Sequence, residues 1–564
     1  MDEVKECYSY HNFIFPFIWE NSKTKVDEKK SIEKYFKNNE YWQSGIPDNH
    51  RISKKEWIDL YSRNEYFHSA FREAILGYDD EFKIDKSIVL FYEFAPEIIE
   101  NGAEYIIIKS YEDDATKEIK KKEYHLDIRR ISIKIFNTGI AVLILECVNY
   151  RYHNLKDIKW INDYGRRTSL PFVPEEENEK SRFSSICADS LKIRIRGKNN
   201  ASDLLYATES FLDRIQEIYE QEEFTIKDIQ EQSSHVCNWI DALLKIGGKE
   251  RCPFVSDETG EVKIYPALDE RMYVMCLIHS GKEERKEEKG DLIDQILSDS
   301  EEAKKIRRSS GDCLEWMNLS HQETLYELAY VDANYCTCQS DLMRKELLQK
   351  CIYDRWIKYG TIYTVTPQAF LCISNNNATI KSFCNMYLDM CVLSLVQRAT
   401  LINFQDIALS LSKGLEEIGK VIDTKKIKEL LDLQERFIAF QNQINLQEIS
   451  SQEQAVELYK KLREASFVEE LAGALKEQLD ALYDATNTNQ DYSFNKWALL
   501  FAIVTLGIDV PTFLFRTDGT LSVFPMEWSG TGILSQIGPH LIIFTITAIA
   551  FGYIFHKFKR KKRK

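Results

Sequence analysis

Two apolar runs, WALLFAIVTLGIDVPTFLF at Trp497–Phe515 and ILSQIGPHLIIFTITAIAFGYIF at Ile533–Phe555, decide the fold of this chain. A helix needs about 20 mainly apolar residues to cross the hydrocarbon core of a bilayer, and both runs reach that length. Buried core helices can contain such runs too, and the first run includes Asp509 and Pro511. The basic tail HKFKRKKRK at His556–Lys564 favours the membrane, because a core helix has no need of a basic stop. We therefore predict a two-helix transmembrane hairpin in residues 496–564.

Charge sets the expected orientation of this hairpin. The tail carries seven Lys and Arg residues, whereas the loop Arg516–Gly532 between the runs has one Arg, one Asp and one Glu. Basic segments stay on the cytoplasmic side of a membrane, so the tail is predicted to be inside. Two crossings then place residues 1–495 in the cytoplasm as well, beneath the inner (plasma) membrane. A charge facing lipid is costly, so Asp509 is expected to face a neighbouring subunit or a water-filled path as a pore-lining residue.

The overall charge bears on the partners. The chain of 564 residues has a net charge of −15 although the tail alone carries +7, so the rest of the chain carries −22. A body this acidic is not expected to bind nucleic acid directly. The tail can instead contact anionic lipid headgroups of the bilayer.

The sequence has no recognisable catalytic or metal-binding motif. Its 13 Cys form no CxxC pair, and its ten His show no zinc-ligand spacing. Motifs of serine hydrolases and phosphate-binding loops are missing too, so we predict no catalytic residue, metal or cofactor, and a protein that is not an enzyme. A tethered nucleotide hydrolase without a known motif stays open as an alternative. The odd Cys count and the cytoplasmic placement predict reduced, buried thiols.

Residues 1–379 are predicted to form an α+β cytosolic domain. Ile131, Ile133 and Ile135 alternate with polar residues, Asn137-Thr138-Gly139 turns the chain, and Ile140–Cys147 is apolar. This pattern predicts a hairpin with one half-exposed and one buried strand. By similar patterns we expect strands at Phe13–Trp19, Leu191–Arg196, Val262–Tyr265, Met272–Ile278, Gly360–Val365 and Phe370–Ile373. We expect helices at Ser53–Leu76, Asp203–Glu222 and Asn385–Ala399, and a short helix or turn at Asp157–Tyr164.

Residues 380–495 are predicted to form a long helical stalk. Thr400–Asp491 is almost free of Gly and Pro and rich in helix-forming residues. Polar segments near Asp423 and at Asn445–Ser451 are expected to divide it. The predicted fold is thus an α+β cytosolic domain, a helical stalk and a C-terminal transmembrane hairpin.

The dipeptide Arg166-Arg167 is the first candidate for ligand binding. A guanidinium is a planar fork of donors that matches phosphate oxygens and stacks on a base. Neighbouring strand residues face opposite ways, so both arginines can reach one ligand only from a turn, which Gly165 would permit. The alternative is a pair of surface salt bridges with the acidic loop Glu175–Glu177.

Further candidates have a functional and a structural interpretation. Arg194 and Arg196 form a basic stripe with Lys192, which could contact a ligand or be an ordinary solvated strand face. Asp269 could accept a hydrogen bond from a ribose hydroxyl or take part in a salt bridge. Tyr164 could stack on an adenine or belong to the core.

The order of these parts resembles the CorA cation channels, in which a soluble body and long helices precede two crossings and a basic tail. That family carries a Gly-Met-Asn signature at the end of its first crossing. This chain has Gly507-Ile508-Asp509 in a similar place, so only the glycine matches. Selection of Mg²⁺ is therefore not carried over by the resemblance.

Four dispersed segments are similar to a narrower group, the CorA-like membrane proteins encoded beside type III CRISPR systems. The resemblance implies an antiviral effector whose cytosolic domain binds a nucleotide second messenger, S-adenosylmethionine joined to AMP (SAM-AMP). The membrane part would then open a pore or disrupt the bilayer. The alternative is a CorA-type divalent metal cation channel. Two helices cannot enclose a path alone, so a homo-oligomer is expected, with five subunits by CorA analogy. The segments are INDYGRRTSLPF at Ile161–Phe172, LDERMYV at Leu268–Val274, RWIKYGTIYTVT at Arg355–Thr366 and LSLVQRATLINF at Leu393–Phe404.

Overall fold

The protein divides into two compact units in a computed structural model. Unit 1 is Met1–Ile407 with Leu433–Glu477, and unit 2 is Ala408–Asp432 with Gln478–Lys564. None of the described helices is both long and apolar enough to cross a membrane, and the predicted hairpin with Asp509 lies outside the described residues. The structure describes residues 7–19, 26–46, 52–78, 88–113, 116–174, 186–197, 202–221, 223–226, 228–229, 235–256, 260, 262–280, 291–309, 312–413 and 424–485.

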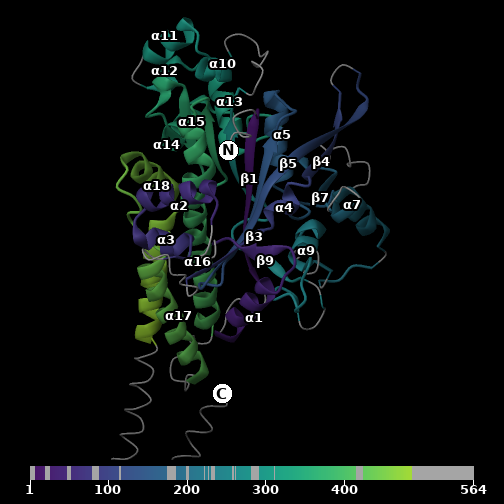
Figure 1. The fold of residues 1–564 in the computed structure, drawn as a ribbon, viewed down its shortest axis with the longest axis vertical. Coiled ribbons are helices and arrows are strands. Elements are labelled where there is room, and N and C mark those ends of the chain that lie inside the picture. The colour runs from purple at the N-terminus through teal and green to yellow at the C-terminus, as the bar shows by residue number, and fades with distance from the viewer. Residues whose placement is uncertain are drawn as a thin grey trace, which may run out of the picture. The chain divides into compact units, whose positions relative to one another are not determined.

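Unit 1 is built on a 13-stranded sheet (Figure 1). The main path of the sheet runs β11-β12-β13-β10-β1-β6-β5-β4-β7-β8, and the pair β10–β13 is parallel. The central strand β1 (Ser9–Trp19) pairs with both β6 and β10, and nearly all of its residues are buried. The predicted strand at Phe13–Trp19 is therefore confirmed. The other strands are β2 (Trp42–Ser44), β3 (Val89–Phe94), β4 (Ala103–Glu112), β5 (Ile119–Phe136), β6 (Ala141–Asn149), β7 (Ser190–Arg196), β8 (Asp203–Ser210), β9 (Ile264–Pro266), β10 (Tyr273–Ile278), β11 (Ile352–Tyr353), β12 (Thr361–Val365) and β13 (Ala369–Ser374).

The predicted hairpin is β5 followed by β6, paired antiparallel across the turn at residues 137–139. Ile131, Ile133 and Ile135 face the core as expected. The prediction of a half-exposed face on β5 is wrong, however, because Ser132 and Lys134 are buried as well. A helix covers that face, so the sheet is buried on both sides here.

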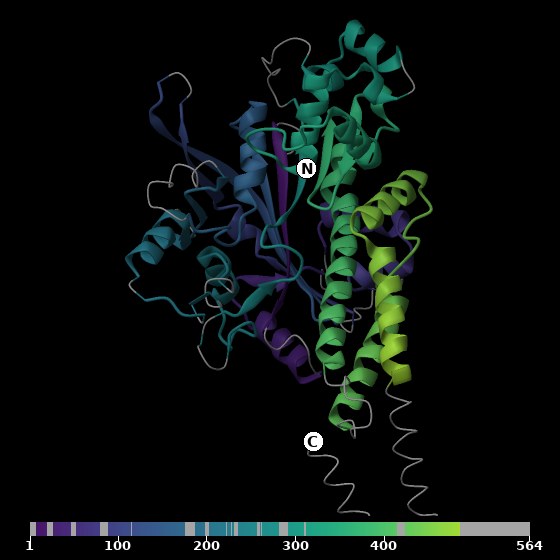
Figure 2. The ribbon, with the colours of Figure 1, turned by 180° about the vertical axis from the view of Figure 1, so that it is seen from behind.

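Helices cover the two faces of the sheet. On one face, Tyr105 of β4 donates a hydrogen bond of 2.8 Å to the carbonyl of Gly165 at the end of α5 (Leu155–Gly165). On the other, Lys134 of β5 donates one of 3.1 Å to Asp389 of α16 (Leu388–Ser412). Figures 1 and 2 show α5 and α16 on opposite sides of β1.

Two predicted helices are interrupted. Ser53–Leu76 forms α2 (Lys54–Tyr66) and α3 (Ser69–Ile75), because His68 is extended and its N–H bonds to the carbonyl of Ile449. Asp203–Glu222 forms strand β8 and helix α7 (Phe211–Glu220) instead of one helix. Pairing with β7 overrides the helical pattern of the first half, a tertiary effect that local propensity does not contain.

Several helices follow the sheet in chain order. After α16 come α17 (Thr424–Gln443), α18 (Glu453–Ala465) and a helix at 468–485. The predicted break at Asn445–Ser451 is confirmed, whereas Asp423 lies outside the described residues. The remaining elements with described bounds are α1 (Val26–Lys37), α4 (Pro96–Ile99), α9 (Asn238–Lys245), α10 (Leu292–Leu297), α11 (Glu301–Ser309), α12 (Cys313–Trp316), α13 (Leu319–Tyr330), α14 (Asp341–Cys351), η4 (Ile357–Tyr359), α15 (Asn377–Ser382) and η5 (Phe383–Tyr387).

All 13 cysteines are buried and none forms a disulfide, as the sequence predicts.

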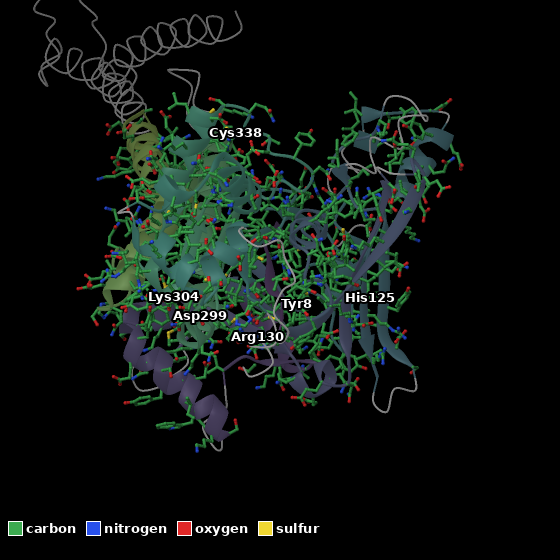
Figure 3. All side chains as sticks on the ribbon, turned by 90° about the horizontal axis from the view of Figure 1, so that it is seen from above. Tyr8, His125, Arg130, Asp299, Lys304 and Cys338 are labelled. Atoms are coloured by element: carbon green, nitrogen blue, oxygen red, sulfur yellow. The ribbon has the colours of Figure 1, made fainter. Side chains whose placement is uncertain are left out.

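In the view from above, Tyr8 at the start of the central strand lies between His125 of β5 and Lys304 of α11 (Figure 3). The sheet and its accompanying helices thus extend to both sides of β1.

Candidate anion-binding site

The end of α5 brings the first candidate residues against the sheet. A Cβ on Gly165 would lie 2.8 Å from both Ile107 and Phe13, so only glycine allows this close approach. The backbone of the next residue, Arg166, is right-handed at φ −85°. Arg166 lies in a turn directly after α5, as the sequence predicts, and Gly165 itself does not have a positive φ. Glycine therefore serves close packing at this position.

A second segment runs beside the arginines. The N–H of Met272 donates to the carbonyl of Arg166 at 2.7 Å, and Arg167 forms an antiparallel bridge with Arg271. This pairing places Arg271 and its neighbour Asp269 at the same site, about 100 residues further along the chain.

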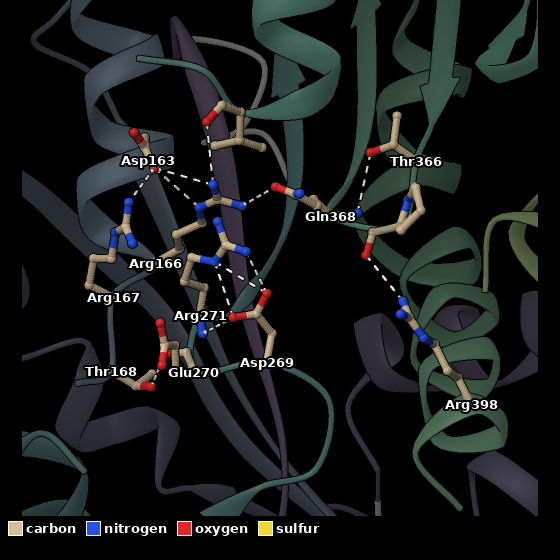
Figure 4. Close-up of polar contacts among 12 residues, drawn as sticks. Asp163, Arg166, Arg167, Thr168, Asp269, Glu270, Arg271, Thr366, Gln368 and Arg398 are labelled. Carbon is tan, nitrogen blue, oxygen red and sulfur yellow. Dashed lines mark hydrogen bonds and ion pairs between the residues drawn. The ribbon is translucent and has the colours of Figure 1, made fainter. Parts of the chain in front are cut away.

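Three arginines share two carboxylates in this cluster (Figure 4). Asp163 accepts from Arg166 at 3.2 and 3.3 Å and from Arg167 at 3.4 Å, all through its Oδ1. Asp269 binds Arg271 through both oxygens, with Arg271 Nη2 2.6 Å from Oδ2. We name Arg166, Arg167 and Arg271 the arginine cluster. Glu270 also acts on Arg271, and Asp332 on Arg166, so an anion is favoured by donors that lack an anionic acceptor and not by an excess of positive charge.

Several donors of the cluster lack an anionic acceptor. The Nε of Arg167 is buried and has no partner within the described part of the chain. Arg166 Nη1 donates to the neutral amide of Gln368 at 3.0 Å, and its Nη2 to the carbonyl of Val331 at 3.4 Å. An unmet buried donor costs about 1–3 kcal/mol, so an anion oxygen that reached these groups would be favoured.

The electrostatic environment fits an incompletely neutralised site. Burial lowers the pKa of Arg166 to about 10, with Asp163 opposing this shift and Arg167 and Arg271 adding to it. Burial likewise lowers the pKa of the neighbouring Lys109 to about 8. For Asp269, partial burial alone would raise the pKa, but hydrogen bonds from Arg271 outweigh it and lower the pKa overall.

The structure places Tyr164 in the wall of the site. Its ring is buried, its hydroxyl donates to Asn334 at 3.0 Å, and Lys109 Nζ lies 4.1 Å from the ring centroid. Lys109 also donates to the carbonyl of Cys187 at 2.7 Å. Tyr164 is thus a packed residue in this arrangement, as the core interpretation expects.

Arg194 and Arg196 do not join the arginine cluster. In the pairing of β4 with β7, Arg194 lies opposite Glu104. Tyr105, the residue after Glu104 on β4, faces α5. Side chains alternate along a strand, so Arg194 and Arg196 lie on the face away from α5. Arg194 donates to Asp203 of β8 at 2.9 Å. The acidic loop proposed as an alternative partner of Arg166 and Arg167 lies outside the described residues.

Sequence reasoning missed the residues that organise the cluster. Asp163 of α5 precedes Arg167 by four residues in the sequence, and this short separation of opposite charges could have signalled the pair although Arg167 lies beyond the end of the helix. Gln368 and Val331 have no such signal, because they lie far from Arg166 in the sequence.

One group of potential metal ligands occurs among the described residues, formed by Asp312, Cys313 and Asp354. The Asp312 carboxylate already accepts from the N–H of Leu314 at 2.9 Å, where it caps α12. Burial raises the pKa of the Cys313 thiol, which disfavours the thiolate that a metal would need.

Comparisons with known proteins add little to this site. No known protein family matches the chain, and no curated protein matches it. Among solved structures, the CorA magnesium transporter from Methanocaldococcus jannaschii is similar at 14% identity, over 35% of this chain and 69% of that chain, with a TM-score of 0.17. A TM-score this low carries no conclusion about the present chain.

Proposed function

We propose that unit 1 is a sensor that binds an anionic nucleotide at the arginine cluster, and that binding controls the predicted membrane hairpin. The observation that carries the proposal is the convergence of Arg166, Arg167 and Arg271, with a buried Arg167 Nε that lacks an acceptor within the described part of the chain. Planar guanidinium forks match phosphate oxygens in pairs, and few neutral ligands would satisfy three of them.

The sequence resemblance supports a more specific form of this proposal. The segments Ile161–Phe172 and Leu268–Val274, which carry the similarity to CRISPR-associated CorA-like effectors, contain the three arginines. We therefore propose SAM-AMP as the ligand and antiviral defence as the role. The protein would act as a homo-oligomer in the inner membrane, by opening a pore or disrupting the bilayer, without chemistry of its own. A CorA-type divalent cation channel is the alternative.

The test replaces the forks and keeps the charge. Replacing both Arg166 and Arg167 by Ala would leave Asp163 buried and unpaired, which risks unfolding. Arg166→Lys with Arg167→Lys retains two cations beside Asp163 and removes the planar pairs of donors. Hydrogen bonds to charged groups contribute roughly 1.5–3 kcal/mol each, so losing both forks should weaken SAM-AMP binding on the order of 10²-fold. Calorimetric titration of the purified full chain measures this directly.

Arg194→Ala is the matched control, because Arg194 also pairs with an aspartate but lies on the opposite face of the sheet. It should bind SAM-AMP like the parent and remain toxic in cells that make the nucleotide. If the double Lys variant binds and kills like the parent while folded, the arginine cluster is not the site. Uptake of divalent cations without any nucleotide would favour the channel alternative.

A further inference from the structure

We propose that Arg398 of α16 transmits occupancy of the arginine cluster to the bend between α18 and the helix at 468–485. The inference rests on the proposed function and concerns how ligand binding at the arginine cluster is transmitted to another part of the chain. In chain order, that last helix leads to the C-terminal segment 486–564, which contains the predicted crossings.

The first link is a single dipeptide that contacts two arginines. Gln368 accepts from Arg166 Nη1 at 3.0 Å, and the carbonyl of Pro367 accepts from Arg398 Nη1 at 3.5 Å. Figure 4 shows Gln368 between the arginine cluster and Arg398. The preceding Thr366 donates to the carbonyl of Ala329 at 2.8 Å and accepts from the N–H of residue 369. These two hydrogen bonds fix the turn at residues 366–369. The Gln368 side chain is the contact of this turn with the arginine cluster.

The second link joins Arg398 to the bend. Its guanidinium lies 5.6 Å from the centre of the Phe467 ring, within the range of a cation–π contact. Phe467 has φ 53°, in the left-handed region that residues other than glycine rarely adopt. Neighbouring Gln397 accepts from Arg463 of α18 at 3.2 Å, and Arg463 also donates to Glu469. Two consecutive residues of α16 therefore hold both sides of a strained bend.

The third observation is that Arg398 is incompletely bonded. Its Nε is buried and has no partner in the regions that the structure describes, and its contact with Pro367 is long. Burial lowers the pKa of Arg398, while Tyr273 and Asp269 oppose this shift, so Asp269 acts on Arg271 and on Arg398. An unmet buried donor is unfavourable, so a rearrangement that gives Arg398 Nε an acceptor would be stabilised.

These contacts define how a ligand would act. An anion that takes the donors of Arg166 removes the hydrogen bond to Gln368, and one that takes Arg271 frees Asp269. Both changes alter the surroundings of Arg398, and therefore its cation–π contact with Phe467. A ligand shifts a bend only if it binds one of its two arrangements more tightly, and Arg398 supplies that difference.

The experiment separates binding from transmission. The full chain in detergent is titrated with AMP and with inorganic pyrophosphate, and hydrogen–deuterium exchange is followed in peptides covering 463–477. In the parent, a saturating probe should change exchange there. Arg398→Gln should bind within about threefold of the parent, because Arg398 is not a ligand contact, yet lose the exchange response. Should Arg398→Gln fail to fold, Phe467→Leu removes the ring and keeps the arginine, with the same expected loss.

Arg436→Gln is the matched control. Arg436 also lies over a phenylalanine, 5.1 Å from the ring centre of Phe404, and also donates to a backbone carbonyl, that of Thr138 at 3.0 Å. It should keep both affinity and response. A full response in Arg398→Gln, or a response missing from a parent that binds, would overturn the inference alone. Loss of binding in Arg398→Gln would make it a ligand contact and also overturn the relay. A parent that binds neither these probes nor SAM-AMP would overturn the proposed function and the relay with it.

Discussion

At the scale of the residue, the buried polar groups of β1 show how much local environment matters. His11 is fully buried, with Nδ1 2.7 Å from Asn162 of α5 and Nε2 2.8 Å from Ser9. Burial lowers its pKa to about 4, although the hydrogen bond that His11 donates to the side-chain oxygen of Asn162 opposes the shift. A histidine held neutral in the folded state makes stability depend on pH.

The sign of this dependence follows from the two protonation curves. The unfolded chain protonates His11 below about pH 6.5, and the folded chain only below about pH 4, so the unfolded state binds more protons in between. Stability should therefore fall as the pH falls from about 6.5 to about 4, by up to about 3 kcal/mol from this residue. Urea unfolding of His11→Gln, followed by tryptophan fluorescence between pH 7 and 4.5, should show a shallower pH dependence than the parent. His125→Gln, on β5, serves as the histidine control, and identical slopes for His11→Gln and the parent would refute the prediction.

At the scale of the element, buried ions attach the long helix to the sheet. Asp389 of α16 accepts from Lys134 of β5 at 3.1 Å and from Arg63 of α2 at 2.6 Å. Burial alone would raise the pKa of Asp389, but Arg63 and Lys134 outweigh it and lower the pKa. This carboxylate therefore joins three elements that lie far apart in the sequence.

Removing the Asp389 charge should be costly. Asp389→Asn keeps the size of the side chain but leaves buried Lys134 without an anion and Arg63 with Asp59 alone. Breaking a buried pair typically costs about 3–5 kcal/mol. The matched control is Asp59→Asn, because Asp59 pairs with the same Arg63 at 3.1 Å from a partly exposed position. It should cost at most about 1 kcal/mol. Urea midpoints measure both, and equal losses would show that burial does not govern this network.

At the scale of the whole molecule, the sequence predicts that both termini are cytoplasmic. All 13 native cysteines are buried, so they give little background in a labelling experiment. Ser522→Cys, in the loop between the apolar runs, should react with an impermeant thiol reagent added outside intact cells. Lys564→Cys, at the end of the basic tail, should react only after the membrane is opened. The opposite pattern would reject the two-crossing topology.

Local pattern alone determined a substantial part of unit 1. The apolar run at Phe13–Trp19, the alternation at Ile131–Ile135 and the polar break at Asn445–Ser451 each predicted an element that the structure contains. These features depend on residues within a few positions of one another, where period and turn chemistry act directly. Arg166 and Arg167 were likewise identified as candidates from local chemistry, before their partners were known.

Only the tertiary structure decided which residues those arginines meet. Arg166 contacts Gln368 across 202 positions of sequence, and Arg167 lies beside Arg271 through a strand-like bridge. The same topology buries Lys134 beneath α16 and puts Arg194 on the face of the sheet away from α5 and the arginine cluster. Contacts of this kind follow from the order of strands in the sheet, and pairing at long range carries no periodic signal along the chain. The local pattern could therefore supply the charged groups, while sheet topology selected which of them form a site.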